Sequence, residues 1–192
     1  MRKATPVPPA ALSPLSDVGP EAHAELPALE RDHVQRVYDA VAVEWHGTRY
    51  KAWPRVVEFI NSLPPRALIA DLGCGNGKLA PVCKEAGHVA IGCDFSRSLI
   101  SIAAQQMGLE AQVADVMQLP YRSGTFDAAV SIAVLHHVST PERRRLLIKE
   151  TLRVLRQGGQ ALFYAWVRDS SSLNHRAPML ILLLLMPCSY SI

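Results

Sequence analysis

The most constraining feature of this chain is a glycine-rich stretch, Asp71–Lys78, which reads Asp-Leu-Gly-Cys-Gly-Asn-Gly-Lys. It directly follows an apolar run that is typical of a buried β-strand. Glycine at a strand-to-helix turn lets the backbone bend sharply and lets a ligand approach closely, because no Cβ atom is in the way. Two phosphate-binding patterns are excluded. Lys78 stands where the dinucleotide fingerprint needs its last glycine, and no Gly-Lys-Ser/Thr closes the loop as in a P-loop.

Short apolar runs alternate with helical stretches along the rest of the chain. Strands are predicted over Ala67–Leu72, Val89–Cys93, Ala111–Ala114, Phe126–Ile132 and Gln160–Trp166. Helices are predicted near Leu79–Glu85, Leu99–Gln106 and Pro141–Leu155, preceded by an amphipathic helix from Arg31 to Trp45 and another that begins at Pro54. This alternation predicts an α/β fold, with a doubly wound parallel sheet covered on both faces.

The two ends of the chain differ from this pattern. Six of the 14 prolines lie between Pro6 and Pro27, so residues 1–28 are expected to be a flexible tail. Residues 29–168 then form the domain, and residues 169–192 form a divergent hydrophobic C-terminal tail. Its apolar run Met179–Met186 has eight residues. That is far below the ~20 needed to span a bilayer, so no membrane association is expected.

Composition narrows the class of protein. With 192 residues and 49% hydrophobic residues the chain can bury the core of one domain. Its net charge of +3 does not by itself indicate a nucleic-acid partner. The four cysteines lack the spacing of metal ligands or of a disulfide framework, so no metal is expected and free thiols fit a reducing compartment. The N-terminus lacks the apolar run of a secretory signal.

Three of the predicted strands end in an aspartate. Asp71 would repel a pyrophosphate, but it suits a ligand that carries an ammonium and a sulfonium, as S-adenosylmethionine (SAM) does. Asp94 would accept hydrogen bonds from ribose hydroxyls, and Asp115 from the adenine amino group. A helix cap explains any one of these acids equally well, but not all three beside the glycine loop. The expected cofactor site comprises Asp71, Gly73, Gly75, Gly77, Asp94, Asp115, Val116 and Ile132.

Five segments carry a resemblance to a known family. They are Thr48–Pro54, Asp71–Lys78, Leu119–Ser123, Ser131–His137 and Ser139–Arg144. Together they resemble class I SAM-dependent methyltransferases (a Rossmann-like fold) and, more narrowly, the tRNA wobble-uridine methyltransferases. The resemblance runs from about Glu30 to Trp166. It implies an enzyme that forms the methyl ester of 5-carboxymethyluridine in the tRNA anticodon loop. It also implies a small zinc-containing activator protein as partner, and a location in the cytoplasm and nucleus.

The chain departs from this family at three places. Phe95 stands where the family usually has Arg, and Gln157 where it usually has Pro. The family continues to two further strands that form an antiparallel pair beside the fifth, and nothing in Ser170–Ile192 resembles them. We therefore interpret the chain as a shortened or alternatively ended member without its C-terminal strand pair. This would leave Gln160–Trp166 as an apolar edge, which only Met179–Met186 could cover, and would make the chain marginally stable with low methyl transfer.

The substrate carboxylate is already ionised at neutral pH, so no general base is needed and catalysis rests on orientation. Arg49 is the candidate anchor and His136 the second catalytic candidate. The candidate substrate-binding residues are Tyr50, Trp53, His137 and Trp166. A surface ion pair remains the alternative for Arg49, and core packing for each tryptophan.

Other interpretations remain open. A solvated helix face is favoured over a tRNA contact for the basic side chains at 145, 149, 153 and 156, and Ser139 with Glu142 suits a capping box. For the whole chain, the alternatives are a methyltransferase acting on a small molecule such as a quinone precursor, and a catalytically impaired form that acts only through binding.

Overall fold

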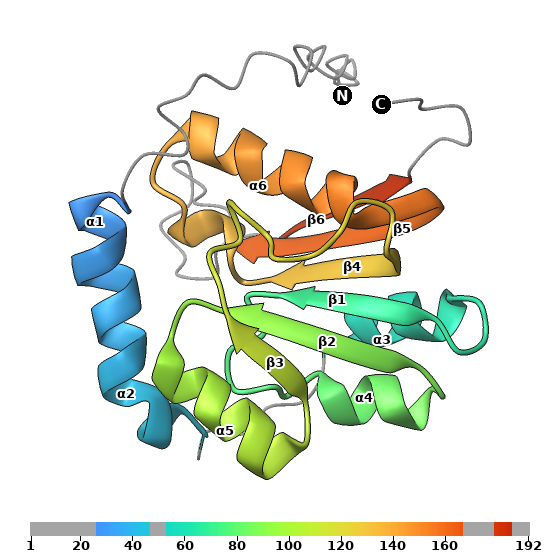
Figure 1. Cartoon of the computed structure of the whole chain (residues 1–192), viewed down its shortest axis with the longest axis horizontal. Coiled ribbons are helices and arrows are strands. Elements are labelled where there is room, and N and C mark those ends of the chain that lie inside the picture. Colours follow the sequence, from blue (N-terminus) through green and yellow to red (C-terminus); the bar gives the residue numbers. More distant parts are fainter. Residues whose placement is uncertain (1–25, 47–52, 167–178, 186–192) are drawn as a thin grey trace, which may run out of the picture.

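The computed structural model describes residues 26–46, 53–166 and 179–185 (Figure 1). Its helices are α1 (Ala28–Glu30), η2 (Arg31–Gln35), α2 (Arg36–His46), α3 (Pro54–Ser62), α4 (Ala80–Glu85), α5 (Arg97–Met107), η3 (Leu135–His137) and α6 (Pro141–Val154). Its strands are β1 (Leu68–Leu72), β2 (Val89–Asp94), β3 (Glu110–Val113), β4 (Phe126–Ile132), β5 (Leu155–Trp166) and β6 (Met179–Leu185). Each predicted strand is present.

The six strands form one sheet in the order β3-β2-β1-β4-β5-β6. The first five run parallel, which confirms the predicted α/β fold of the class I methyltransferase type. The order reverses after β1, because β2 and β3 lie on one side of it and β4 and β5 on the other. In open α/β sheets a ligand binds at such a switch point, beyond the carboxyl ends of the strands. The site is therefore expected where Asp71 lies.

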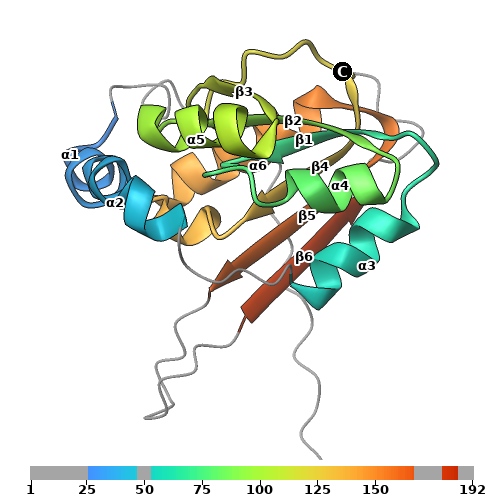
Figure 2. The same cartoon turned by 90° about the horizontal axis from the view of Figure 1, so that it is seen from below.

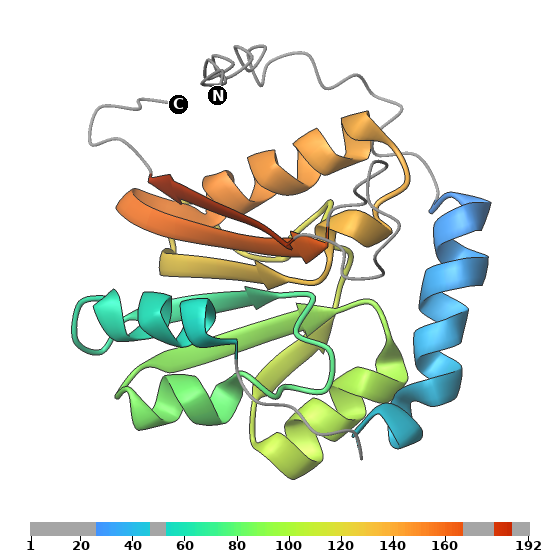
Figure 3. The same cartoon turned by 180° about the vertical axis from the view of Figure 1, so that it is seen from behind.

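Helices cover both faces of the sheet (Figures 2 and 3). On one face α6 packs through Leu146 and Leu147 into a core that includes Ala70 of β1. On the other face α3 packs with α4 into a core that includes Ile69, the neighbouring residue of β1. Successive residues of a strand point to opposite faces, so β1 is buried on both sides, as its apolar sequence predicts.

The edge of β5 is covered, which corrects the sequence-based expectation of a bare edge. Strand β6 runs antiparallel to β5, from the pair Gln160–Leu185 to the pair Trp166–Met179. One antiparallel strand thus lies where the sequence suggested that a strand pair was missing. Of the apolar run Met179–Met186, residues Met179–Leu185 form this strand. The ladder uses backbone N–H donors, which every residue except proline has.

Two absences hold for the described residues. None of their helices is long and apolar enough to cross a membrane. Within the same ranges, no group of three His, Cys, Asp or Glu side chains is arranged to hold a metal ion. The predicted tails, residues 1–28 and 169–192, lie mostly outside the described ranges.

Candidate functional site

A cavity of about 500 Å³ opens at the carboxyl ends of the central strands. The helical segment from α1 to α2 runs across these strand ends and forms one wall (Figures 1 and 3). The glycine loop after β1 and the segments after β2, β3 and β4 form the other walls. The acidic side chains of this lining come from four different elements: Glu30, Asp71, Asp94 and Asp115. Among the described lining residues, Lys78 supplies the one lysine or arginine.

The glycine loop is held against β2 by its backbone. The amide groups of Gly73 and Cys74 both donate to the carbonyl oxygen of Cys93, at 2.8 and 2.9 Å. A Cβ atom at Gly73 would lie 2.2 Å from Cγ2 of Val134, so only glycine allows this contact. A Cβ atom at Gly75 would meet nothing within 4 Å, because Gly75 faces the open cavity. The loop therefore leaves room for a ligand at Gly75.

Two buried carboxylates lie beside the loop. Asp94 accepts hydrogen bonds from the backbone of Gly75 at 3.0 Å and of Ser96 at 2.9 Å. Burial raises the pKa of Asp94, and these bonds offset part of the rise. Burial also raises the pKa of Asp71 to about 7, and the charge of Asp94 adds to this effect. A cation bound in the cavity would favour the ionised form of both groups.

The third aspartate follows β3. One oxygen of Asp115 accepts from the backbone of Met117 at 2.9 Å, and the other lies 3.7 Å from Nη2 of Arg143. Val116 and Ile132 also line the cavity. The structure thus brings together seven of the eight residues that the sequence predicted for the cofactor. Gly77 is the exception, because it does not line the cavity and packs against Ala103 of α5.

Both histidines lie in η3 at the edge of the cavity, with ring centroids 4.2 Å apart. Nε2 of His137 lies 3.0 Å from the hydroxyl oxygen of Tyr38. Burial lowers the pKa of His136 to about 4, and the neighbouring His137 contributes. Burial lowers the pKa of His137 as well. At neutral pH the pair is uncharged, so it can form hydrogen bonds but cannot neutralise an anion.

The remaining predicted residues fall in different places. Trp53 lines the cavity and packs on Tyr164, with ring centroids 4.9 Å apart. Trp166 ends β5, but its side chain lies outside what the structure describes. Arg49 and Tyr50 also lie outside the described residues. The proposed anchor for the substrate carboxylate therefore stays a prediction.

Sequence reasoning missed the wall that α1, η2 and α2 supply. Glu30, Val34 and Tyr38 from this segment line the cavity, as does Leu26 just before it. Further contacts tie the segment to the turn after β2, where Gln35 donates to the carbonyl of Phe95 at 3.3 Å. The predicted amphipathic stripe included Val34 and Tyr38, but the pattern shows only that one face is covered. It does not show that the covered face borders a cavity.

The chain is similar in sequence to known methyltransferases. Residues 70–163 match the family model described as a methyltransferase domain. The chain is 43% identical over 152 residues to the tRNA (carboxymethyluridine(34)-5-O)-methyltransferase alkbh8 of Xenopus tropicalis, covering 79% of this chain and 24% of that protein. It is 43% identical over 144 residues to the tRNA (carboxymethyluridine(34)-5-O)-methyltransferase of Saccharomyces cerevisiae, covering 74% of this chain and 51% of that protein. The chain thus spans about a quarter to a half of these relatives' lengths.

Solved structures show the same fold. SpnF, a [4+2]-cyclase, matches with a TM-score of 0.63 at 23% identity, over 76% of this chain and 62% of that chain. A protein from the complex of the Haloferax volcanii Trm112 methyltransferase activator with a methyltransferase matches with a TM-score of 0.58 at 20% identity, over 67% and 59%. A SAM-dependent methyltransferase from Methanosarcina mazei matches with a TM-score of 0.55 at 27% identity, over 62% and 60%.

Proposed function

Residues 70–163 belong to the methyltransferase-domain family, and on that premise we propose that this chain transfers a methyl group from SAM to the carboxylate of 5-carboxymethyluridine at the wobble position of tRNA. The observation that carries the proposal is the acidic lining of the cavity, with Asp71 and Asp94 both buried beside the glycine loop. SAM brings an ammonium and a sulfonium, which suit such a lining. The choice of substrate is supported by the names of the relatives described above.

The lining residues fit SAM in its separate parts. Asp94, at the end of β2, would accept from the ribose hydroxyls, since it has lone pairs beyond those that cap Gly75 and Ser96. Asp115 would accept from the adenine amino group, and Val116 and Ile132 would supply apolar surface. Asp71 would face the ammonium group. Gly75 leaves the approach open.

The proposed reaction requires the protein mainly to orient the two reactants. Bound SAM supplies a methyl group that is activated by the adjacent sulfonium. The substrate carboxylate is a nucleophile without loss of a proton, so the protein needs to align it and exclude water. Neutral His136 and His137 would hold substrate groups by hydrogen bonds, and Trp53 would offer a stacking surface for the base. Arg49, Tyr50 and Trp166 complete the proposed substrate site.

The contacts of α6 argue against its basic side as the tRNA surface. Arg153 donates to the carbonyl oxygens of Tyr121 and Leu119, at 2.8 and 3.0 Å, and it also pairs with Glu150. Arg156, which lies in β5 and not in the helix, pairs with Asp127 of β4. These side chains hold the loop before β4 and the start of β5. Two of the four predicted basic side chains are therefore engaged within the domain, which counts against phosphate contacts at these two positions.

We propose a small zinc-containing activator protein as partner. One similar solved structure is a methyltransferase in complex with the Trm112 activator. Co-expression with such a protein, followed by size-exclusion chromatography, would test the assembly. Elution as separate proteins at micromolar concentration would contradict it. We also propose a location in the cytoplasm and nucleus, because of the resemblance to tRNA wobble-uridine methyltransferases.

The central experiment has two stages. Isothermal titration with SAM tests the cofactor, and Asp94→Ala should weaken binding by about 1–3 kcal/mol through lost charge-assisted hydrogen bonds. Transfer of labelled methyl groups to tRNA that contains carboxymethyluridine then tests the reaction. Arg49→Ala should reduce transfer and leave SAM affinity nearly unchanged. Arg55→Ala is the matched control, because Arg55 makes an exposed ion pair with Glu58 on α3.

The outcomes separate the alternatives. SAM binding with transfer to a small molecule but not to tRNA would favour the small-molecule methyltransferase. SAM binding without any transfer would favour a chain that acts only through binding. Absence of SAM binding by the folded chain would refute the proposed function.

A further inference from the structure

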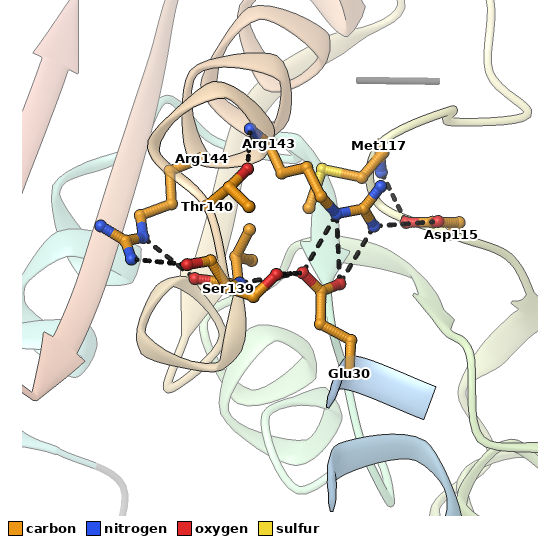
Figure 4. A network of polar contacts seen from close by, with 8 residues as sticks. Glu30, Asp115, Met117, Ser139, Thr140, Arg143 and Arg144 are labelled. Carbon is orange, nitrogen blue, oxygen red and sulfur yellow. Dashed lines mark hydrogen bonds and ion pairs between the residues drawn. The ribbon is translucent and has the colours of Figure 1, made fainter. Parts of the chain in front are cut away.

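Glu30 is a buried acid that the proposed reaction does not use directly. It ends α1 and lines the cavity, and 4% of its surface is exposed. One carboxylate oxygen accepts from the backbone and hydroxyl groups of Ser139, at 2.8 and 2.6 Å, and from Nε of Arg143 at 3.1 Å. The other accepts from Nη2 of Arg143 at 3.0 Å (Figure 4). Both oxygens are therefore held by directed bonds.

Arg143 connects this acid to a second one. Arg143, in α6, is 5% exposed, and its Nη2 lies 3.0 Å from Glu30 and 3.7 Å from Asp115 (Figure 4). The second oxygen of Asp115 accepts from the backbone of Met117. Glu30 and Asp115 both line the cavity, whereas Arg143 is not among the lining residues. Arg143 thus lies behind the wall and pairs with two acids that line the cavity.

Helix α6 begins at a different capping residue from the one that the sequence predicted. Ser139 and Glu142 suggested a capping box, but the cap of α6 is Thr140, whose hydroxyl accepts from the backbone of Arg143 at 3.2 Å. Ser139 instead donates twice to Glu30. Burial raises the pKa of Glu30, but the bonds from Ser139 and Arg143 outweigh it and hold the pKa below its usual value. Glu30 is therefore ionised at neutral pH.

A buried ion pair of this kind need not add net stability. Replacing a buried ion pair by apolar side chains of similar volume is often neutral or stabilising, because two charges must lose their water. What the pair provides is geometry. The guanidinium is a rigid planar fork, and Glu30 holds it at both Nε and Nη2. Because this same Nη2 lies 3.7 Å from Asp115, the bonds to Glu30 fix the position of the cation beside that carboxylate.

We propose that Arg143 is a positioning residue that makes the cavity selective for an adenine base, by holding the carboxylate of Asp115 in one orientation. The inference rests on the proposed use of SAM at this site. Adenine presents an exocyclic amino donor, and hypoxanthine presents a carbonyl acceptor at the same position. A carboxylate held in place accepts a hydrogen bond from the amino group of adenine and repels the carbonyl oxygen of hypoxanthine. A carboxylate that can turn away distinguishes the two bases poorly.

The experiment compares two ligands that differ at this position: S-adenosylhomocysteine and S-inosylhomocysteine. Their dissociation constants are measured by isothermal titration for the natural chain and for Arg143→Met. The natural chain should prefer the adenosine ligand on the order of tenfold, from one charge-assisted hydrogen bond. Arg143→Met should bring this ratio close to one, mainly by weakening the adenosine ligand. Arg145→Met is the matched control, because Arg145 makes an exposed pair with Glu142 in the same helix, and it should keep the natural ratio.

Two further variants keep the inference testable if Arg143→Met does not fold. Arg143→Met leaves Glu30 buried without its charged partner, so the pair Glu30→Gln with Arg143→Met removes both charges together. This double variant should also lose the ratio while it keeps a cooperative thermal transition. Asp115→Ala should lose the ratio by itself, and adding Arg143→Met should change it no further, since Arg143 acts through Asp115.

The results separate this inference from the proposed function. If both ligands weaken equally and the ratio is unchanged in the folded Arg143 variants, the cluster is structural and the inference is wrong. If Asp115→Ala keeps the ratio, the inference is also wrong. If the natural chain binds neither ligand, the proposed use of SAM fails and the inference fails with it.

Discussion

Asp71 gives the fold a pH dependence of predictable sign. It ends β1 with 3% of its surface exposed, and burial, helped by the charge of Asp94, raises its pKa from 3.8 to about 7. In the unfolded chain the pKa returns to its ordinary value. Between these two values the folded state binds the proton and the unfolded state does not. The stability due to Asp71 is therefore fully present below pH 3.8 and is lost as the pH rises through about 7.

The magnitude follows from the two pKa values. A rise from 3.8 to about 7 corresponds to about 4 kcal/mol between the protonation states, of which roughly 3 kcal/mol falls between pH 5 and pH 8. Asp71→Asn keeps the shape of the side chain and removes the titration. Relative to the natural chain, this variant should gain roughly 3 kcal/mol of stability from pH 5 to pH 8. In a domain of this size that is roughly 6–12 °C in Tm.

The comparison between the two chains is needed because other groups titrate in the same range. Burial lowers the pKa values of His136 and His137, so their contribution to stability increases with pH up to about 6.5. Their effect is the same in both chains and cancels in the difference. Thermal unfolding of both chains without ligand, at pH 5, 6, 7 and 8, gives the measurement. Glu58→Gln is the control, because Glu58 pairs at an exposed site.

Ligand binding supplies a second readout of the same group. The ammonium group of SAM would favour ionised Asp71, so binding at pH 6 should release a proton. Titrations in buffers with different ionisation enthalpies would measure a release approaching one proton. Asp71→Asn should abolish it. Parallel Tm curves for the two chains, or binding of SAM without proton release, would refute the reasoning about Asp71.

The remaining predictions concern the loop, the wall and the sheet edge. Gly73→Ala should unfold at a lower temperature than Gly75→Ala, because its Cβ atom would lie 2.2 Å from Val134, whereas that of Gly75 meets nothing within 4 Å; thermal melts that coincide would contradict this. Tyr38→Phe removes the bond to His137 and should cost about 0.5–1.5 kcal/mol in urea unfolding. A chain ended at residue 178 lacks β6 and should scatter light at concentrations where the full chain does not, since the edge of β5 is then unpaired. Equal solubility of the two chains would show that β6 does not protect this edge.

Local patterns in the sequence predicted most of the fold and the floor of the site. Parallel strands end at one edge of the sheet, so Asp71, Asp94 and Asp115 had to lie near one another once the strands were recognised. Periodicity could not predict which residues close the cavity from the other side. Glu30 and Tyr38 contact residues about a hundred positions away, and such contacts leave no local pattern.

Strand β6 forms although much of its sequence lacks the usual features of a strand. Side-chain alternation and β-branching predict strands well where packing on one face decides the pairing. Leu182–Leu185 has neither feature, yet it pairs along β5 through its backbone. The glycine motif likewise does not show which of its glycines line the cavity. Gly77 follows the same alternation as Gly73 and Gly75, but it packs on α5, and this depends on where α5 lies.

The bond between Glu30 and Arg143 joins residues that are 113 positions apart, and this separation matters while the chain is being made. Synthesis at roughly 5–20 residues per second puts roughly 6–23 seconds between the two residues. During that interval Glu30 lacks its arginine partner, and contacts such as that of Gln35 with Phe95 are what hold this wall of the cavity. A nascent chain therefore acquires the strands and the glycine loop first, and gains a complete pocket only after α6 has left the ribosome. Ligand added to stalled nascent chains should bind only those in which α6 has fully emerged.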